Sequence, residues 1–196
     1  MTTQKATSDD PLLDLVMRSQ DDDQRAFAEL VVQTQEGVYN LAYNILGNRQ
    51  EAEDMTQEIY LRVWQALPSF RGESKFTTWL YRIATNACLN RRRYLRPQLS
   101  LVDEPDTLDD LIAPQKDALV TTIEHERQAF LWEAVRALPE KYRLVITLFY
   151  RQELTYKEVA EVLSLPLGTV KAHLNRARRA LAQRLRMAEE VKDVAL

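Results

Sequence analysis

The stretch LTYKEVAEVLSLPLGTVKAHLNRARRAL, near the C-terminal end, constrains the fold more than any other part of the chain. Thr155 followed three residues later by Glu158 is a pattern that caps the start of a helix. Residues 164–166, Ser-Leu-Pro, interrupt that helix with a turn, and Thr169 then lies in the first turn of a second helix. A short helix, a tight turn and a second helix predict a helix-turn-helix motif.

The second helix of this motif has two different faces. At about 100° per residue, Val170, Leu174, Ala177 and Leu181 fall on one narrow arc, which we expect to be buried. The opposite arc is polar and basic, and the small Ala172 allows close approach to the edges of bases. An ordinary helical hairpin with a solvated basic face is the alternative. The candidate duplex-contacting residues are Thr169, Lys171, Ala172, Asn175, Arg176 and Arg179.

Helix is expected almost throughout the chain. There are only four glycines in 196 residues, and helix-forming residues are abundant. The segment 98–120 is acidic, lacks a sustained helical period and contains Pro105 and Pro114, which predicts a flexible linker. We therefore expect an all-α fold with two small helical domains, residues 12–97 and 121–188, the second carrying the helix-turn-helix. Residues 1–11 are expected to be a disordered tail, and residues 189–196 a C-terminal tail.

Several classes of protein are disfavoured by the composition. Cys88 is the only cysteine, which argues against a disulfide framework or a cysteine-based zinc site. No apolar run approaches the roughly 20 residues that span a bilayer. The first ten residues also lack the apolar core of a signal peptide. We expect a cytoplasmic protein with no membrane insertion.

The charges are strongly segregated, although the net charge is only −3. Residues 74–102 contain six basic residues and no acidic one, and residues 164–188 again contain six and none. The compensating acids lie in the N-terminal tail, near residues 51–58 and in residues 103–117. This segregation predicts two separate surfaces that bind anions.

The first basic segment is FRGESKFTTWLYRIATNACLNRRR, residues 70–93. Helical spacing places Leu80, Ile83, Ala84 and Ala87 on a core side. The other side carries a tryptophan, two asparagines and cations, a combination suited to single-stranded DNA because aromatic rings stack on bases and cations attract phosphates. The alternative is that Phe70, Phe76 and Trp79 simply belong to the core. The residues on the other side are Trp79, Arg82, Asn86, Asn90 and Arg93.

The helix expected over residues 49–67 has apolar side chains on two sides. One side forms a sufficient core stripe of Ala52, Met55, Ile59, Val63 and Ala66. Leu61 and Trp64 project to the other side, beside Asp54, Gln57, Glu58 and Gln65. Apolar residues surrounded by polar ones are typical of a protein interface. For Trp64, cover by another helix of the same domain is the alternative.

Three stretches, in this order, resemble the extracytoplasmic-function (ECF) subfamily of bacterial RNA polymerase sigma factors. They are YNLAYNILGNRQEAEDMTQEIYLRVWQAL, FRGESKFTTWLYRIATNACLNRRR and the helix-turn-helix. The resemblance covers most of residues 27–185. It implies that residues 12–97 are sigma region two and residues 121–188 are sigma region four, with the linker passing through the polymerase cleft.

The resemblance also implies partners and roles for these surfaces. Core RNA polymerase is the first partner, bound through the clamp helices of its largest subunit and the flap of its second-largest subunit. An anti-sigma factor is the second partner. No cofactor, metal or catalytic residue is expected. The face for the clamp helices is Asp54, Gln57, Glu58, Leu61, Arg62 and Trp64.

For promoter DNA, the resemblance implies that region two recognises and melts the minus-ten element, while the helix-turn-helix reads the minus-thirty-five element. The loop 70–76 and Asn86 would hold a flipped base, and residues 91–93 would grip the duplex backbone. The candidate minus-ten residues are Phe70, Arg71, Gly72, Glu73, Ser74, Lys75, Phe76, Trp79, Arg82, Asn86, Asn90, Arg91, Arg92 and Arg93.

Two other functions are the alternatives to a sigma factor. A helix-turn-helix repressor or activator would use the same C-terminal module, but as a reader of duplex DNA it has no need of the segment 70–93. A helical enzyme is disfavoured because His125 and His173 are the only histidines, no HExxH spacing occurs, and there is no glycine-rich phosphate loop.

Overall fold

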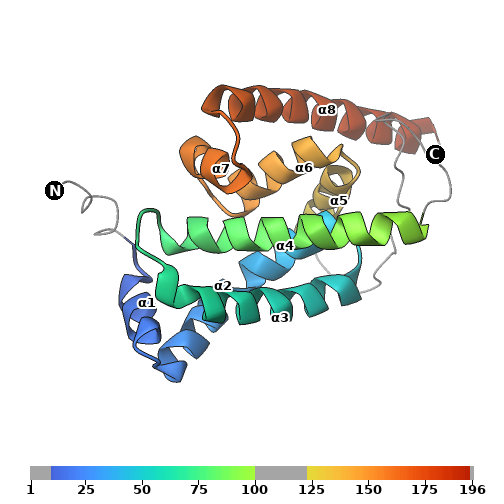
Figure 1. The fold of residues 1–196 in the computed structure, drawn as a ribbon. Helices are drawn as coiled ribbons and strands as arrows, with labels where there is room; N and C mark the ends of the chain where they lie inside the picture. Colours follow the sequence, from blue (N-terminus) through green and yellow to red (C-terminus); the bar gives the residue numbers. More distant parts are fainter. Residues whose placement is uncertain (1–9, 100–122, 195–196) are drawn as a thin grey trace.

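The computed structural model describes residues 10–99 and 123–194, and within these ranges the chain is built from helices and turns, without a strand (Figure 1). The all-α fold expected from the sequence is confirmed. The expected linker, apart from its first two residues, and most of the N-terminal tail lie outside the described residues. None of the described helices is both long enough and apolar enough to cross a membrane.

The N-terminal half contains four α-helices, with α2 and α3 packed against α4 (Figure 1). In chain order its elements are α1 (Leu13–Gln20), α2 (Gln24–Leu46), α3 (Arg49–Ala66), a 3-10 turn η1 (Leu67–Ser69) and α4 (Phe76–Leu99).

Local capping explains where α2 and α3 begin and end. The side chain of Asp23 accepts hydrogen bonds from the backbone N–H groups of Arg25 and Ala26, which satisfies donors in the first turn of α2. Gly47 ends α2 with φ of 72°, a left-handed conformation that glycine adopts without steric cost. Asn48 then caps α3 through the N–H of Glu51.

The core of the N-terminal half is formed where α2, α3 and α4 meet. Leu30, Leu41, Ile59 and Leu80 are completely buried there. Cys88 on α4 is also completely buried, and burial raises the pKa of its thiol to about 12. Apolar burial of this kind supplies most of the stabilisation of a helical domain.

The C-terminal half forms a second layer over α4 (Figure 1). Val145, Leu148, Val159 and Val170 are completely buried within this half. Its elements are α5 (Ile123–Arg136), α6 (Glu140–Ile146), a π-helical turn η2 (Thr147–Arg151), α7 (Tyr156–Leu163) and α8 (Leu167–Val194).

The structure differs from the sequence prediction at the N-terminal boundary. A turn at residues 21–23 separates α1 from α2. Asp22 in this turn has φ of 63°, which stops α1. The tail was expected to reach residue 11, yet Asp10 accepts hydrogen bonds from the N–H groups of Leu12 (3.0 Å) and Phe76 (2.7 Å).

Two helices extend past the boundaries expected from the sequence. The first helical domain was expected to end at residue 97, but α4 continues to Leu99. Pro97 lies two residues before the end of α4, so the lost hydrogen bond and the steric clash of a proline affect only its last turns. The C-terminal tail was expected from residue 189, whereas α8 continues to Val194.

Candidate nucleic-acid interface

Three aromatic rings meet at the start of α4. The ring of Phe70 lies 5.1 Å from Trp79 and 6.0 Å from Phe76, and the last two rings are 5.9 Å apart. Phe76 is 1% exposed and belongs to the core, and Trp79 is also largely covered, with 9% of its surface exposed. Phe70 remains half-buried. The cluster therefore forms a firm apolar base under the loop 70–75.

The loop 70–75 is anchored from a distant part of the chain. The carboxylate of Asp10 accepts a hydrogen bond from the N–H of Phe76, the first residue of α4, at 2.7 Å. Gly72 has φ of 67°, a conformation that favours glycine. No sequence signal pointed to Asp10, because 66 residues separate it from its partner. The rest of the loop lies at the surface. Its exposed residues are Arg71, Glu73 and Lys75, and its partly exposed residues are Gly72 and Ser74.

The two sides of α4 differ as the helical spacing predicted. Leu80, Ala84 and Ala87 are buried, and Ile83 is half-buried. On the other side Asn86, Asn90 and Arg93 are exposed and Arg82 is half-buried. Trp79 is the exception, because it turns into the aromatic cluster. The polar edge of α4 begins at Arg82 and ends at Arg93.

The three consecutive arginines of α4 have three different environments. Arg91 donates two hydrogen bonds to Glu51 of α3, at 2.7 and 3.1 Å, and these bonds hold the pKa of Glu51 below its usual value. Arg92 pairs with Glu140 of the C-terminal half. Arg93 is exposed. This basic segment contains no acidic residue of its own, but two of its arginines pair with glutamates of α3 and of the C-terminal half.

The helix-turn-helix has the capping geometry that the sequence predicted. The N–H of Thr155 donates to the Glu158 carboxylate at 2.7 Å, and the N–H of Glu158 donates to Thr155 Oγ1 at 3.3 Å. Ser164 ends α7 with φ of 52°, in the left-handed region. Residues 164–166 therefore form the predicted turn between α7 and α8.

The predicted faces of α8 are present in the structure. Val170, Leu174 and Ala177 are buried, and Leu181 is half-buried. Burial, with the nearby charges of Lys141 and Arg176, lowers the pKa of His173, whose ring meets Tyr142 edge-on at 5.9 Å. Among the candidate DNA-contacting residues Thr169 is half-buried, and the following are exposed: Lys171, Ala172, Asn175, Arg176 and Arg179.

The second side of α3 is only partly covered. Trp64 packs edge-on against Phe27 of α2, with ring centroids 4.7 Å apart, so a helix of the same half covers part of it. Leu61 is 65% exposed, although it is a large apolar residue. Arg62 bonds to Glu58 one turn earlier, and both side chains remain at the surface. Asp54 and Gln57 are exposed beside them.

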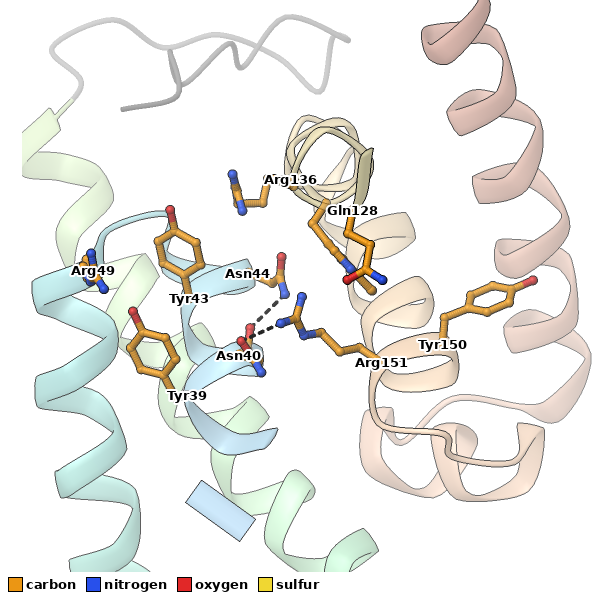
Figure 2. A pocket seen from close by; sticks show the side chains of 11 residues that line it. Tyr39, Asn40, Tyr43, Asn44, Arg49, Gln128, Arg136, Tyr150 and Arg151 are labelled. Carbon is orange, nitrogen blue, oxygen red and sulfur yellow. Dashed lines mark hydrogen bonds between the residues drawn. The ribbon is translucent and has the colours of Figure 1, made fainter. Parts of the chain in front are cut away.

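A cavity of about 480 Å³ lies between the two halves (Figure 2). From the C-terminal half, Arg151 reaches α2 and donates a hydrogen bond to Asn40 Oδ1 at 2.9 Å. Its guanidinium lies 4.8 Å from the centre of the Trp132 ring, and burial lowers its pKa. Arg136 lies in the same way over Tyr43, at 4.9 Å. Sequence reasoning missed this contact region altogether.

Comparison with protein families identifies both halves. Residues 30–97 match the family model for Sigma-70 region 2, and residues 128–181 match the model for Sigma-70, region 4. The first match includes the exposed edge of α4 and the partly covered side of α3. The second includes the helix-turn-helix.

Curated relatives match over nearly their whole length. The ECF RNA polymerase sigma factor SigW of Bacillus subtilis is 39% identical over 174 residues, which is 84% of this chain and 91% of the relative. The ECF RNA polymerase sigma-E factor of Escherichia coli K12 is 35% identical over 180 residues, covering 85% of this chain and 90% of the relative.

Solved structures share the fold. CnrH, in complex with the cytosolic domain of CnrY, has a TM-score of 0.66 and 22% identity, covering 88% of this chain and 96% of that one. The sigma factor RpoE of Bartonella quintana, in complex with the anti-sigma factor NepR, has a TM-score of 0.60 and 21% identity, covering 82% and 96%. Two family regions match in order, and the curated relatives align with this chain over about nine tenths of their length. This chain therefore belongs to the ECF family of RNA polymerase sigma factors.

Proposed function

We propose that this chain binds core RNA polymerase, directs it to specific promoters and helps to melt their minus-ten region. The observation that carries the proposal is the presence of two separate polar and basic surfaces on one chain, the edge of α4 and the outer face of α8. A reader of duplex DNA needs only the second surface. A protein that must also hold a separated strand needs both.

We propose the partly covered side of α3, which carries Leu61 and Trp64, as the docking site for the clamp helices of the largest polymerase subunit. Leu61 is the central apolar contact, and Asp54, Gln57 and Arg62 form its polar rim. This arrangement matches the general anatomy of interfaces, in which a few apolar anchors lie within a polar surround. The C-terminal half would meet the flap of the second-largest subunit.

Melting is assigned to α4 and the loop before it. Moving a base out of the duplex stack costs a few kcal/mol, so a pocket must compensate once the base has left. Phe70, half-buried above Phe76 and Trp79, offers a ring face, and Asn86 offers amide groups to a base edge. Trp79 contributes mainly by supporting Phe70 from below, because little of its own surface is exposed.

We further propose control by an anti-sigma factor and a cytoplasmic location. The complexes of CnrH with CnrY and of RpoE with NepR support such a partner. Each of these surfaces would act by binding alone, without catalytic chemistry or a bound cofactor.

The docking assignment is tested by replacing Leu61 with serine and asking whether the chain still co-purifies with core polymerase. Loss of an apolar hot spot costs about 2 kcal/mol or more, which corresponds to at least a roughly 30-fold weaker complex. Met17→Ser is the matched control, because Met17 is 58% exposed on α1, outside the proposed face. Equal recovery of both variants would contradict the assignment, and transcription in vitro from a genomic promoter library tests the wider function.

A further inference from the structure

The cavity of about 480 Å³ between the two halves belongs neither to the surfaces proposed for DNA nor to the docking face on α3 (Figure 2). Its volume lies within the roughly 300–1,000 Å³ that is usual for small-molecule sites. No acidic residue is among the described residues that line it, and its aromatic side chains are Tyr39, Tyr43, Trp132 and Tyr150. The cavity is therefore suited to a flat or anionic ligand rather than to a cation.

Two arginines give the wall of this cavity a positive charge. Arg151 is held by neutral groups, the amide of Asn40 and a tryptophan ring, and Arg136 lies over the ring of Tyr43. Within the described part of the chain, neither guanidinium forms a salt bridge. Burial lowers the pKa of Arg151, and Glu36, which does not line the cavity, raises it by less. A guanidinium presents its donors in a planar fork that fits the oxygens of a phosphate, so a phosphate is the anion that we expect here.

Ring faces and a buried amide lie beside these cations. The rings of Tyr39 and Tyr43 are parallel, with centroids 6.2 Å apart, and both are half-buried, so a flat ligand can stack on them. Asn44 lines the cavity and is only 2% exposed. Its Nδ2 donates to the backbone oxygen of Asn40 at 2.8 Å, but its Oδ1 accepts no hydrogen bond from the described residues. A buried acceptor without a donor is unfavourable, so an N–H group of a ligand beside it would be stabilising.

We propose that this cavity binds a nucleoside monophosphate. The phosphate would bind to Arg136 and Arg151, the base would stack on the tyrosine rings, and an N–H group of the base would face Asn44. Free phosphate lacks the ring and a nucleoside lacks the charge, so each alone would use only part of the site. The inference does not depend on promoter binding, because no residue of α4 or α8 is among those that line the cavity.

The first test is isothermal titration of the full chain with AMP, CMP, GMP and UMP. We expect saturable binding of at least one of them to a single site. The matching nucleoside and inorganic phosphate should each bind at least about ten-fold more weakly, because one loses the charge-assisted hydrogen bonds and the other loses the stacking. Absence of saturable binding for all four nucleotides would overturn the inference, as would inorganic phosphate that binds as tightly as the nucleotide.

Substitutions locate the site. Arg136→Gln removes one cation and Tyr39→Leu removes one ring, and each should weaken nucleotide binding about ten-fold. Arg25→Gln is the matched control, because Arg25 is exposed on α2 and does not line the cavity, and it should bind like the wild type. Unchanged affinity in either cavity variant would overturn the inference. Binding that is lost in Asn86→Ala but kept in Arg136→Gln would place the nucleotide on the exposed edge of α4, and would overturn it too.

A second measurement uses the wild-type chain and so does not depend on how the variants fold. The azido derivative of the nucleotide that binds most tightly is cross-linked by light, and mass spectrometry identifies the labelled peptides. We expect the label within residues 39–44 and 128–151, and a label confined to other residues would contradict the proposal. A 5′-phosphorylated trinucleotide should compete at least about ten-fold less well, because the cavity has the volume of a site for one small molecule. Equal competition would assign the site to the end of a nucleic-acid strand and overturn the inference.

Discussion

Arg91, Arg92 and Arg93 are chemically identical and adjacent, yet only Arg93 lies on the exposed edge of α4. Arg91 is bound to Glu51 within its own half, and Arg92 is bound to Glu140 of the other half. Both pairs are partly covered, so either arginine must leave its carboxylate before it can bind another anion. Successive residues on a helix point about 100° apart, which is why three adjacent arginines have three different environments.

Arg176 allows a test of sequence reading at the level of a single residue. It is exposed on the outer face of α8, beside Asn175. Replacement by alanine is expected to weaken promoter binding by about 1–3 kcal/mol if the guanidinium contacts a base, and to relax preference at one upstream position. Electrophoretic mobility shifts with the holoenzyme on single-base promoter variants measure both effects.

Arg186→Ala is the control for this prediction, because Arg186 is an exposed arginine of the same helix. It should reduce affinity equally for all promoters or leave it unchanged. If Arg176→Ala also weakened every promoter variant by the same factor, Arg176 would be a phosphate contact and base reading would lie elsewhere.

At the scale of elements, α4 is a core helix, and its exposed edge is the proposed surface for a DNA strand. Its inner side, with Leu80, Ala84 and Ala87, is packed against α2 and α3. Its first turn is fixed by Asp10 and by the aromatic cluster around Trp79. A rigid support reduces the entropy lost when the exposed edge binds a strand, so less of the binding energy is spent on ordering the site.

Trp79 and Asn86 are expected to behave differently when replaced by alanine. Trp79→Ala removes a nearly buried ring and should lower the free energy of unfolding by about 3–5 kcal/mol. Asn86→Ala changes an exposed side chain, so it should leave stability unchanged and lower the yield of open promoter complex. Urea unfolding measures the first effect, and permanganate footprinting measures the second.

A promoter template already mismatched across the minus-ten region provides the control. It removes the cost of unpairing, but it does not restore a lost base contact, so the defect of Asn86→Ala should persist in part on this template. Full recovery would show that Asn86 acts before base capture. Normal thymine reactivity on the matched template would show that this edge of α4 is only a scaffold.

For the whole molecule, the sequence predicted contacts between residues close together in the chain and missed contacts between residues far apart. The capping box of Thr155 and Glu158 and the faces of α8 depend on residues three or four apart, so their patterns were readable. The contacts of Asp10 with Phe76 and of Arg92 with Glu140 join residues 66 and 48 positions apart. Nothing in a local pattern marks such partners, and the packing of the two halves was therefore not predicted.

Cys88 has a practical consequence for experiments on the whole molecule. It is the only thiol in the chain, it is completely buried, and its pKa is raised to about 12. Thiol reagents attack the thiolate, so at neutral pH the folded chain should react very slowly, and an added surface cysteine can be labelled without removing the native one. Alkylation of Cys88, followed by mass spectrometry as urea is increased, should then report the opening of the N-terminal core. Rapid alkylation without urea would show that the core around α4 opens readily, and Cys88 would then be a built-in probe of that opening.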